Sequence, residues 1–220
     1  MFASTLLGAG LALLTSTRLV AAQGSLNLTL TFYSDGDDAC SGQDSKAVSF
    51  STASYPVAQD CFNLDDIFSN NSTGGFRNLS SPNIQDISWA ISNSQGWDST
   101  GNYSHVRYEQ LGPAGKSDDD KATYASRRVN IYNGRNCLQA ASPEDDEVEL
   151  PWFGWTCHSS EDDHCRTAPY NIKSFGILPI DADKQKGKCL DFALYGAGAR
   201  SFPDTFGALV SAILVGFFLL

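Results

Sequence analysis

The stretch Leu26-Asn-Leu-Thr-Leu-Thr-Phe-Tyr33 alternates apolar and polar side chains along most of its length. A period of two is typical of a β-strand with one buried face. Comparable short segments recur along the chain, and none shows the sustained 3.6-residue period of an amphipathic helix. We expect strands at 26–33, 47–51, 55–57, 84–91, 105–110, 124–132, 172–180 and 190–195, and loops at 65–76 and 92–101. The pattern predicts an all-β protein, a disulfide-stapled β-sandwich with long loops.

The composition narrows the classes of function. The chain has 220 residues, and 25 acidic against 15 basic side chains give it a formal charge of −10. This charge disfavours a nucleic-acid-binding protein, because such proteins present a basic surface to the phosphates. The hydrophobic share of 42% is that of a folded chain rather than a disordered one. Six cysteines suit an oxidising compartment.

Apolar segments at both ends predict sorting signals. The first ends in the small residues Val20 and Ala22, as a signal peptide cleaved before Gln23 does. The second, 206–220, follows small residues around Gly196 and a polar spacer, the pattern of a GPI-attachment signal. A buried helix at the first end, and a tail anchor or core segment at the second, are the alternatives.

These signals define the expected domains and location. We expect a signal peptide at 1–22, an ectodomain at 23–196 attached to GPI at Gly196, and a removed signal at 197–220. The protein would then be extracellular, at the cell surface, on the plasma membrane or in the cell wall. Glycosylation triplets Asn-x-Ser/Thr agree with this location and start at Asn27, Asn70, Asn71, Asn78 and Asn102.

An internal repeat covers about 26–91 and 124–180. In each copy a strand that ends in Tyr leads into a turn with Gly, two cysteines follow, and a second strand closes the copy. Two such units would pack into one core. Six cysteines allow fifteen pairings, and the repeat favours pairs within each copy. We therefore expect the disulfides Cys40–Cys61, Cys137–Cys157 and Cys165–Cys189.

Residues 30–35 (Leu-Thr-Phe-Tyr-Ser-Asp) and 170–179 (Tyr-Asn-Ile-Lys-Ser-Phe-Gly-Ile-Leu-Pro) resemble the opening and closing strands of a βγ-crystallin-like Greek-key unit. The resemblance covers about 26–180 and implies two Greek-key units; a different β-sandwich is the alternative. The chain also resembles small GPI-anchored fungal surface proteins of unassigned function. Some crystallin-like proteins bind calcium between their paired units, where adjacent Asn/Asp residues and a later Ser supply oxygens. Asn83 and Asn171 each stand without the second residue of that adjacent pair.

Acidic loops hold the remaining candidates for a metal site. Calcium prefers carboxylate and carbonyl oxygens, and the candidates are Asp35, Asp37, Asp118 and Asp119. Acidic loops more often are solvated surface, so we expect no cofactor, with calcium as the alternative. Zinc at His158 and His164 is disfavoured, because the neighbouring cysteines would be oxidised in a secreted chain.

Aromatic residues provide the candidate ligand-binding site. The sequence contains no nucleophile-elbow, zinc-protease or phosphate-loop motif, so we assign no catalytic residue and leave enzymatic activity undecided. Trp97 and Trp152 are the candidate binding residues, because aromatic faces stack on sugar rings. We expect Trp97 to be the most exposed tryptophan, and Trp89 and Trp155 to lie in the core.

Together these features predict a non-catalytic GPI-anchored glycoprotein of the cell surface or cell wall. Its function would be structural, or the binding of glycan or another surface. Its partners would be the outer leaflet of the membrane, through GPI, and cell-wall glycan, but not nucleic acid. The alternative is a secreted carbohydrate-active enzyme or a calcium-binding crystallin-like protein.

Overall fold

A computed structural model describes residues 27–36, 40, 45–78, 86–111, 124–141, 149–159, 165–181 and 189–195. Outside the described residues lie the expected signal peptide, Gly196, the attachment signal, Asp37, Asp118, Asp119 and His164.

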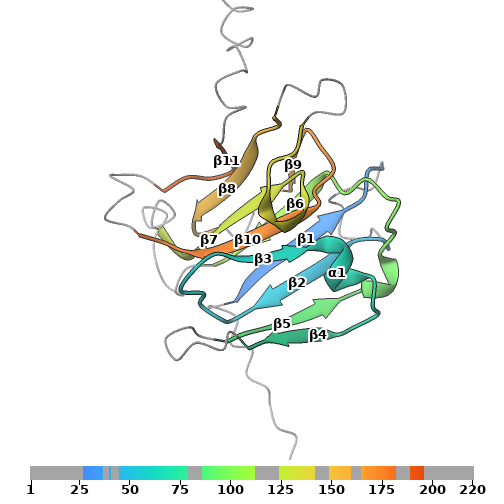
Figure 1. The fold of residues 1–220 in the computed structure, drawn as a ribbon, viewed down its shortest axis with the longest axis horizontal. Helices are drawn as coiled ribbons and strands as arrows, with labels where there is room; N and C mark the ends of the chain where they lie inside the picture. Colours follow the sequence, from blue (N-terminus) through green and yellow to red (C-terminus); the bar gives the residue numbers. More distant parts are fainter. Residues whose placement is uncertain are drawn as a thin grey trace, which may run out of the picture.

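Two antiparallel sheets pack together and form a sandwich (Figure 1). In order, sheet A contains β4 (Gly74–Arg77), β5 (Ile87–Ser92), β2 (Val48–Thr52), β1 (Leu28–Tyr33), β6 (His105–Glu109) and β9 (Arg166–Thr167). Sheet B contains β11 (Ala193–Tyr195), β8 (Trp152–Cys157), β7 (Tyr124–Tyr132), β10 (Ser174–Pro179) and β3 (Asp60–Asn63). The helical elements of the described residues are α1 (Leu64–Phe68), η1 (Ser94–Gly96) and η3 (Arg135–Cys137). The prediction of an all-β, disulfide-stapled sandwich is confirmed.

The alternation in the first strand sets which side chains enter the core. Leu28, Leu30 and Phe32 are buried, whereas Thr29 and Thr31 face outward on sheet A. Antiparallel pairing places Leu30 opposite Phe50 of β2 and opposite Tyr108 of β6. The inward side chains of three neighbouring strands therefore form one apolar row.

Phenylalanines from both sheets meet at the centre of the core. The ring of Phe175 on β10 lies 4.9 Å from that of Phe50 and 5.5 Å from that of Phe32, both from sheet A. Phe62 on β3 stacks on Phe175 at 5.2 Å. Because burial of each such side chain contributes about 1.5–3 kcal/mol, this cluster accounts for a large part of the attraction between the sheets. Trp155 is buried and Trp89 packs partly buried against Phe50 and Phe62, as expected.

Strands from distant parts of the chain are exchanged between the sheets. β3 leaves the sheet of β1 and β2 and pairs with β10 in sheet B, where Figure 1 shows the two strands side by side. In the other direction, β9 leaves the sheet of β7 and β8 and pairs with β6 in sheet A. The chain thus crosses between the two sheets both before and after β7 in the sequence.

This exchange makes the expected disulfide pairing wrong. All six cysteines are bonded, but the pairs are Cys40–Cys165, Cys61–Cys137 and Cys157–Cys189. Cys61 lies on β3, and β3 contacts η3. The partner of Cys61 is therefore Cys137 on η3. Cys165 precedes β9 and therefore reaches sheet A. The expectation failed because it assumed that each half of the chain closes on itself.

Four strands were missed: β3, β4, β8 and β9. No strand forms at 55–57, where Val57 is exposed, and α1 and β4 occupy parts of the expected loop at 65–76. β4 begins Gly-Gly and shows no alternation that a sequence pattern could detect. The structure requires Gly75 there, because a Cβ would lie 2.2 Å from Cζ2 of Trp89.

A fully buried arginine, near the start of β7, links the two sheets by hydrogen bonds. The guanidinium of Arg127 on β7 donates from Nε to Gln110 Oε1 at 2.7 Å, and from Nη1 to the carbonyls of Thr52 and Ser54, both at 3.0 Å. Thr52 ends β2, so these bonds connect sheet B to sheet A. Burial lowers the pKa of Arg127 from its ordinary value.

A second polar link joins the edge strands β3 and β4. The Asp60 carboxylate accepts from the guanidinium of Arg77, whose Cζ also lies 4.8 Å above the ring of Phe62. Burial raises the pKa of Asp60, although the charge of Arg77 acts in the opposite direction. Within the described ranges, no helix is long and apolar enough to cross a lipid bilayer.

Candidate functional site

A hollow of about 250 Å³ opens at one end of the sandwich, where β3 and β7 end and β10 begins. Its walls combine an aromatic ring, charges of both signs, amides and a hydroxyl. The groups that matter below are those of Asp65, Trp97, Ser99, Arg135, Asn171 and Lys173. Pockets for drug-sized ligands are usually about 300–1,000 Å³, so this hollow suits one small ring.

Trp97 forms the aromatic wall of the hollow. Its ring stacks on Tyr103 with centroids 4.4 Å apart and contacts Phe68 at 5.5 Å. Trp97 is therefore partly buried against the core, as Trp89 also is. Its indole Nε1 is buried and donates to no acceptor in the part of the chain that the structure describes. Packing holds the ring in place before any ligand arrives.

Two amides shape the hollow through bonds to the backbone. Asn171 Oδ1 accepts from Tyr103 N at 3.0 Å, and its Nδ2 donates to Gly101 O at 3.1 Å. Asn133 binds Ala140 in the same two-sided way. The bonds of Asn171 fasten the loop that carries Trp97 to the segment before β10, and those of Asn133 hold the turn after β7. Each amide retains one further N–H for another acceptor.

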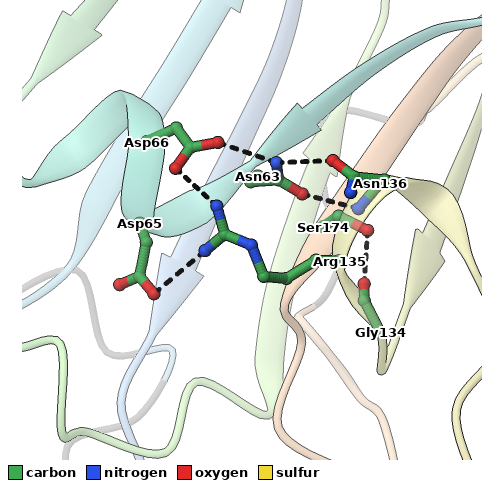
Figure 2. A network of polar contacts seen from close by, with 7 residues as sticks. All are labelled: Asn63, Asp65, Asp66, Gly134, Arg135, Asn136 and Ser174. Carbon is green, nitrogen blue, oxygen red and sulfur yellow. Dashed lines mark hydrogen bonds and ion pairs between the residues drawn. The ribbon is translucent and has the colours of Figure 1, made fainter.

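Figure 2 shows the polar network that fixes Arg135 beside the hollow. Arg135 Nη2 donates to Asp66 Oδ1 at 2.6 Å, and Nη1 lies 3.5 Å from Asp65 Oδ2. Asn63 donates to Asp66 Oδ2 at 2.7 Å and accepts from Asn136 N at 2.7 Å. The bond from Asn63, and then that from Arg135, lower the pKa of Asp66. The Arg135 charge is thus compensated within the protein.

Ser174 and a disulfide hold the turn that carries Arg135. Ser174 Oγ donates to Gly134 O at 2.6 Å and accepts from Cys137 N at 3.0 Å, the first of which Figure 2 shows. Cys137 is bonded to Cys61 on β3. The network and the covalent link make this rim of the hollow rigid.

Lys173 supplies a cation that no carboxylate of the described residues compensates. Its backbone is fixed, because its N–H donates to Tyr132 O at 2.9 Å and its carbonyl accepts from Leu64 N at 3.1 Å. No carboxylate among the described residues forms an ion pair with its ammonium group. Lys173 therefore brings three N–H donors to the hollow that remain available to a ligand.

Trp152 belongs to a second cluster, on the outward face of sheet B. Its ring stacks on Tyr195 with centroids 4.5 Å apart and lies 5.6 Å from Tyr132. The guanidinium carbon of Arg128 lies 5.1 Å from the Trp152 ring and 4.5 Å from the Tyr195 ring. We call Arg128, Tyr132, Trp152 and Tyr195 the aromatic platform. Sequence reasoning named only Trp152, because nothing in the sequence showed that β11 would place Tyr195 opposite it.

Asp35 is the only weak metal candidate that the structure describes, and its carboxylate is engaged with neighbouring side chains. One oxygen accepts from Asn102 Nδ2 and the other from Ser104 Oγ, while His105 Nδ1 lies 3.3 Å away. These contacts join the turn after β1 to the start of β6. Within the described residues, no three His, Cys, Asp or Glu side chains gather into a metal-binding group.

The five predicted glycosylation asparagines, Asn27, Asn70, Asn71, Asn78 and Asn102, are all exposed. Exposure meets the steric requirement of glycosylation and leaves the sites as predictions. Comparisons of the chain with models of protein families, with curated proteins and with solved structures found no match.

Proposed function

We propose that the protein is a non-catalytic module of the cell surface or cell wall and that it binds glycan in the hollow at Trp97. The observation that carries this proposal is the combination of groups in the hollow: a fixed aromatic ring beside an uncompensated ammonium, a carboxylate and a hydroxyl. A sugar ring offers an apolar C–H face and hydroxyls that both donate and accept. It therefore needs a flat apolar wall and polar partners of both kinds.

Each group would have a separate task. The face of Trp97 stacks on the sugar ring, Lys173 donates to a hydroxyl oxygen, and the Asp65 carboxylate accepts from a hydroxyl. A monosaccharide has about 12 non-hydrogen atoms, so at about −0.3 kcal/mol per atom the expected Kd is on the order of 1 mM. Useful affinity would then come from several copies of the module on one surface.

The location is part of the same proposal. Three disulfides and five exposed acceptor asparagines support an extracellular glycoprotein. The GPI tether at Gly196 rests on the sequence pattern alone. Phosphatidylinositol-specific phospholipase C should release a tethered protein from intact cells, whereas retention of all the protein after treatment would reject the tether.

Titration followed by NMR tests binding in the hollow. Neutral oligosaccharides of glucose, mannose and N-acetylglucosamine serve as probes, and at least one should shift resonances of 97–101 and 171–173. Lys173→Gln should weaken binding of that probe at least fivefold. Lys46→Gln is the matched control, because it removes the same charge from a lysine outside the hollow, and it should change the affinity less than twofold. Equal loss in both variants, or no shift with any probe, would reject the proposal.

A further inference from the structure

Arg128 is partly buried on the outward face of sheet B, and no carboxylate of the described residues forms an ion pair with it. Among the described residues, its guanidinium donates one hydrogen bond, from Nε to Asn130 Oδ1 at 2.9 Å. Both terminal nitrogens, Nη1 and Nη2, are left without a protein acceptor in the described part of the chain. An arginine in this state can donate two parallel bonds to an oxyanion.

The surroundings of Arg128 hold its guanidinium in one orientation. Asn130, which accepts from Nε, in turn donates from Nδ2 to Tyr132 Oη at 3.1 Å. Gly154 on the neighbouring strand makes room for Asn130, because a Cβ at Gly154 would lie 2.3 Å from Asn130 Oδ1. A fixed guanidinium loses little conformational entropy when a ligand binds.

The rings beside Arg128 add a second type of contact. Trp152 and Tyr195 are nearly parallel, with 12° between their planes, and both are only partly buried. The hydroxyl of Tyr195 is buried and has no partner among the described residues, which is rare for a tyrosine in a native structure. The exposed parts of the two rings form a flat apolar surface beside the guanidinium.

From this arrangement we propose that the aromatic platform is a second binding site, for a carboxylate-bearing sugar of an acidic glycan. The carboxylate accepts two bonds from Nη1 and Nη2 of Arg128, and the sugar ring lies against Trp152 and Tyr195. The protein as a whole carries a formal charge of −10, so its general field repels such a ligand. Binding therefore depends on this local arrangement rather than on net charge.

Calorimetry of the intact ectodomain with trigalacturonate tests the site. The methyl ester of the trimer is the matched probe, since it removes the charges and keeps the rings, and acetate tests the carboxylate alone. Trigalacturonate should bind at least tenfold more tightly than either. Arg128→Gln should lower that affinity at least tenfold, and Arg107→Gln less than twofold. Arg107 is a suitable control because it is a partly buried arginine near one ring, Tyr33, on the opposite sheet.

A second variant covers the case in which Arg128→Gln does not fold. Asn130→Asp keeps the size of the side chain and neutralises Arg128 from within the protein, so trigalacturonate binding should fall at least tenfold. Among the probes, the proposal is overturned if acid and ester bind alike, if acetate binds as tightly as the trimer, or if nothing binds. Among the variants, it is overturned if Arg107→Gln has the same effect as Arg128→Gln, or if Asn130→Asp retains the affinity. Binding of neutral sugars in the hollow does not involve Arg128, so failure here is distinct from failure of the proposed function.

Discussion

The hydroxyl pairs between β1 and β2 on sheet A and the aromatic platform on sheet B differ in whether neighbouring groups of the described residues satisfy their donors. On sheet A, Thr29 and Thr31 of β1 pair across the strands with Ser51 and Ser49 of β2, with oxygens 2.9 Å apart in each pair. On sheet B, the terminal donors of Arg128 in the aromatic platform have no acceptor among the described residues. Hydroxyls that bind one another offer few donors and acceptors to a ligand. A fixed guanidinium with free N–H donors can bind one.

Of the two disulfides that involve sheet B, the one that spans more of the chain should contribute more to stability. By the chain-entropy relation, loss of Cys61–Cys137, which spans 76 residues, should cost about 4.5 kcal/mol. Loss of Cys157–Cys189, which spans 32 residues, should cost about 3.7 kcal/mol. Denaturant unfolding of the two double-serine variants measures both values. A smaller loss for the Cys61–Cys137 variant would contradict the view that this bond anchors the sheet B rim of the hollow.

A small increase in side-chain volume should cost more stability on sheet B than on sheet A. Gly154→Ala on sheet B forces Cβ against Asn130 Oδ1 and against the carbonyl of Val129, 2.7 Å away, and should cost about 1–3 kcal/mol. Ala90→Val on β5, exposed on sheet A, adds more volume but should stay within about 0.5 kcal/mol. Urea unfolding compares the two. Equal costs would show that sheet B is no more tightly arranged than sheet A.

Removal of a hydroxyl from sheet A should have a still smaller effect. Thr31→Val keeps the branched shape and loses the bond to Ser49, which should lower the unfolding free energy by about 0.5 kcal/mol. The affinities for trigalacturonate and for the neutral sugars should not change. If either affinity falls more than twofold, the hydroxyl face takes part in binding and the contrast between the faces fails.

The smallest effect concerns pH. The pKa of Asp66 is lowered in the folded state, so its ionised form stabilises the fold above the ordinary value of 3.8, and this contribution disappears as the pH falls through the folded-state pKa. In Asp66→Asn, the stability of the fold should therefore fall less steeply as the pH drops below 3.8. Thermal unfolding from pH 2 to 6 measures the slope. An unchanged slope would contradict the network of Figure 2, and Asp35→Asn, outside that network, is the control.

The strands with a clear alternation could be predicted from the sequence. The bounds of β7 agree with the prediction of 124–132, and β1 falls within its predicted range of 26–33. β4 and β9 could not be found, because Gly-Gly-Phe-Arg and Arg-Thr are too short to show a period. The disulfides were mispaired for a topological reason: the strand exchange of β3 and β9 depends on contacts far apart in the sequence.

The candidate sites were predicted in part. Trp97 and Trp152 were singled out by residue type, and each contributes to one of the two proposed sites. Lys173, Arg128 and Tyr195 were missed, because their importance depends on which charges lie nearby and which strands are neighbours. Of the acidic metal candidates that the sequence suggested, the described Asp35 is engaged with Asn102 and Ser104.

The four tryptophans allow the most direct test of the central claim, that ligands bind at the hollow and at the platform. Selective ¹⁵N labelling gives one indole N–H signal for each of Trp89, Trp97, Trp152 and Trp155, assigned with single Trp→Phe variants. A neutral oligosaccharide should move the Trp97 signal, and trigalacturonate the Trp152 signal, while the core signals of Trp89 and Trp155 stay in place. Movement of all four signals together, or of none with either probe, would contradict the account.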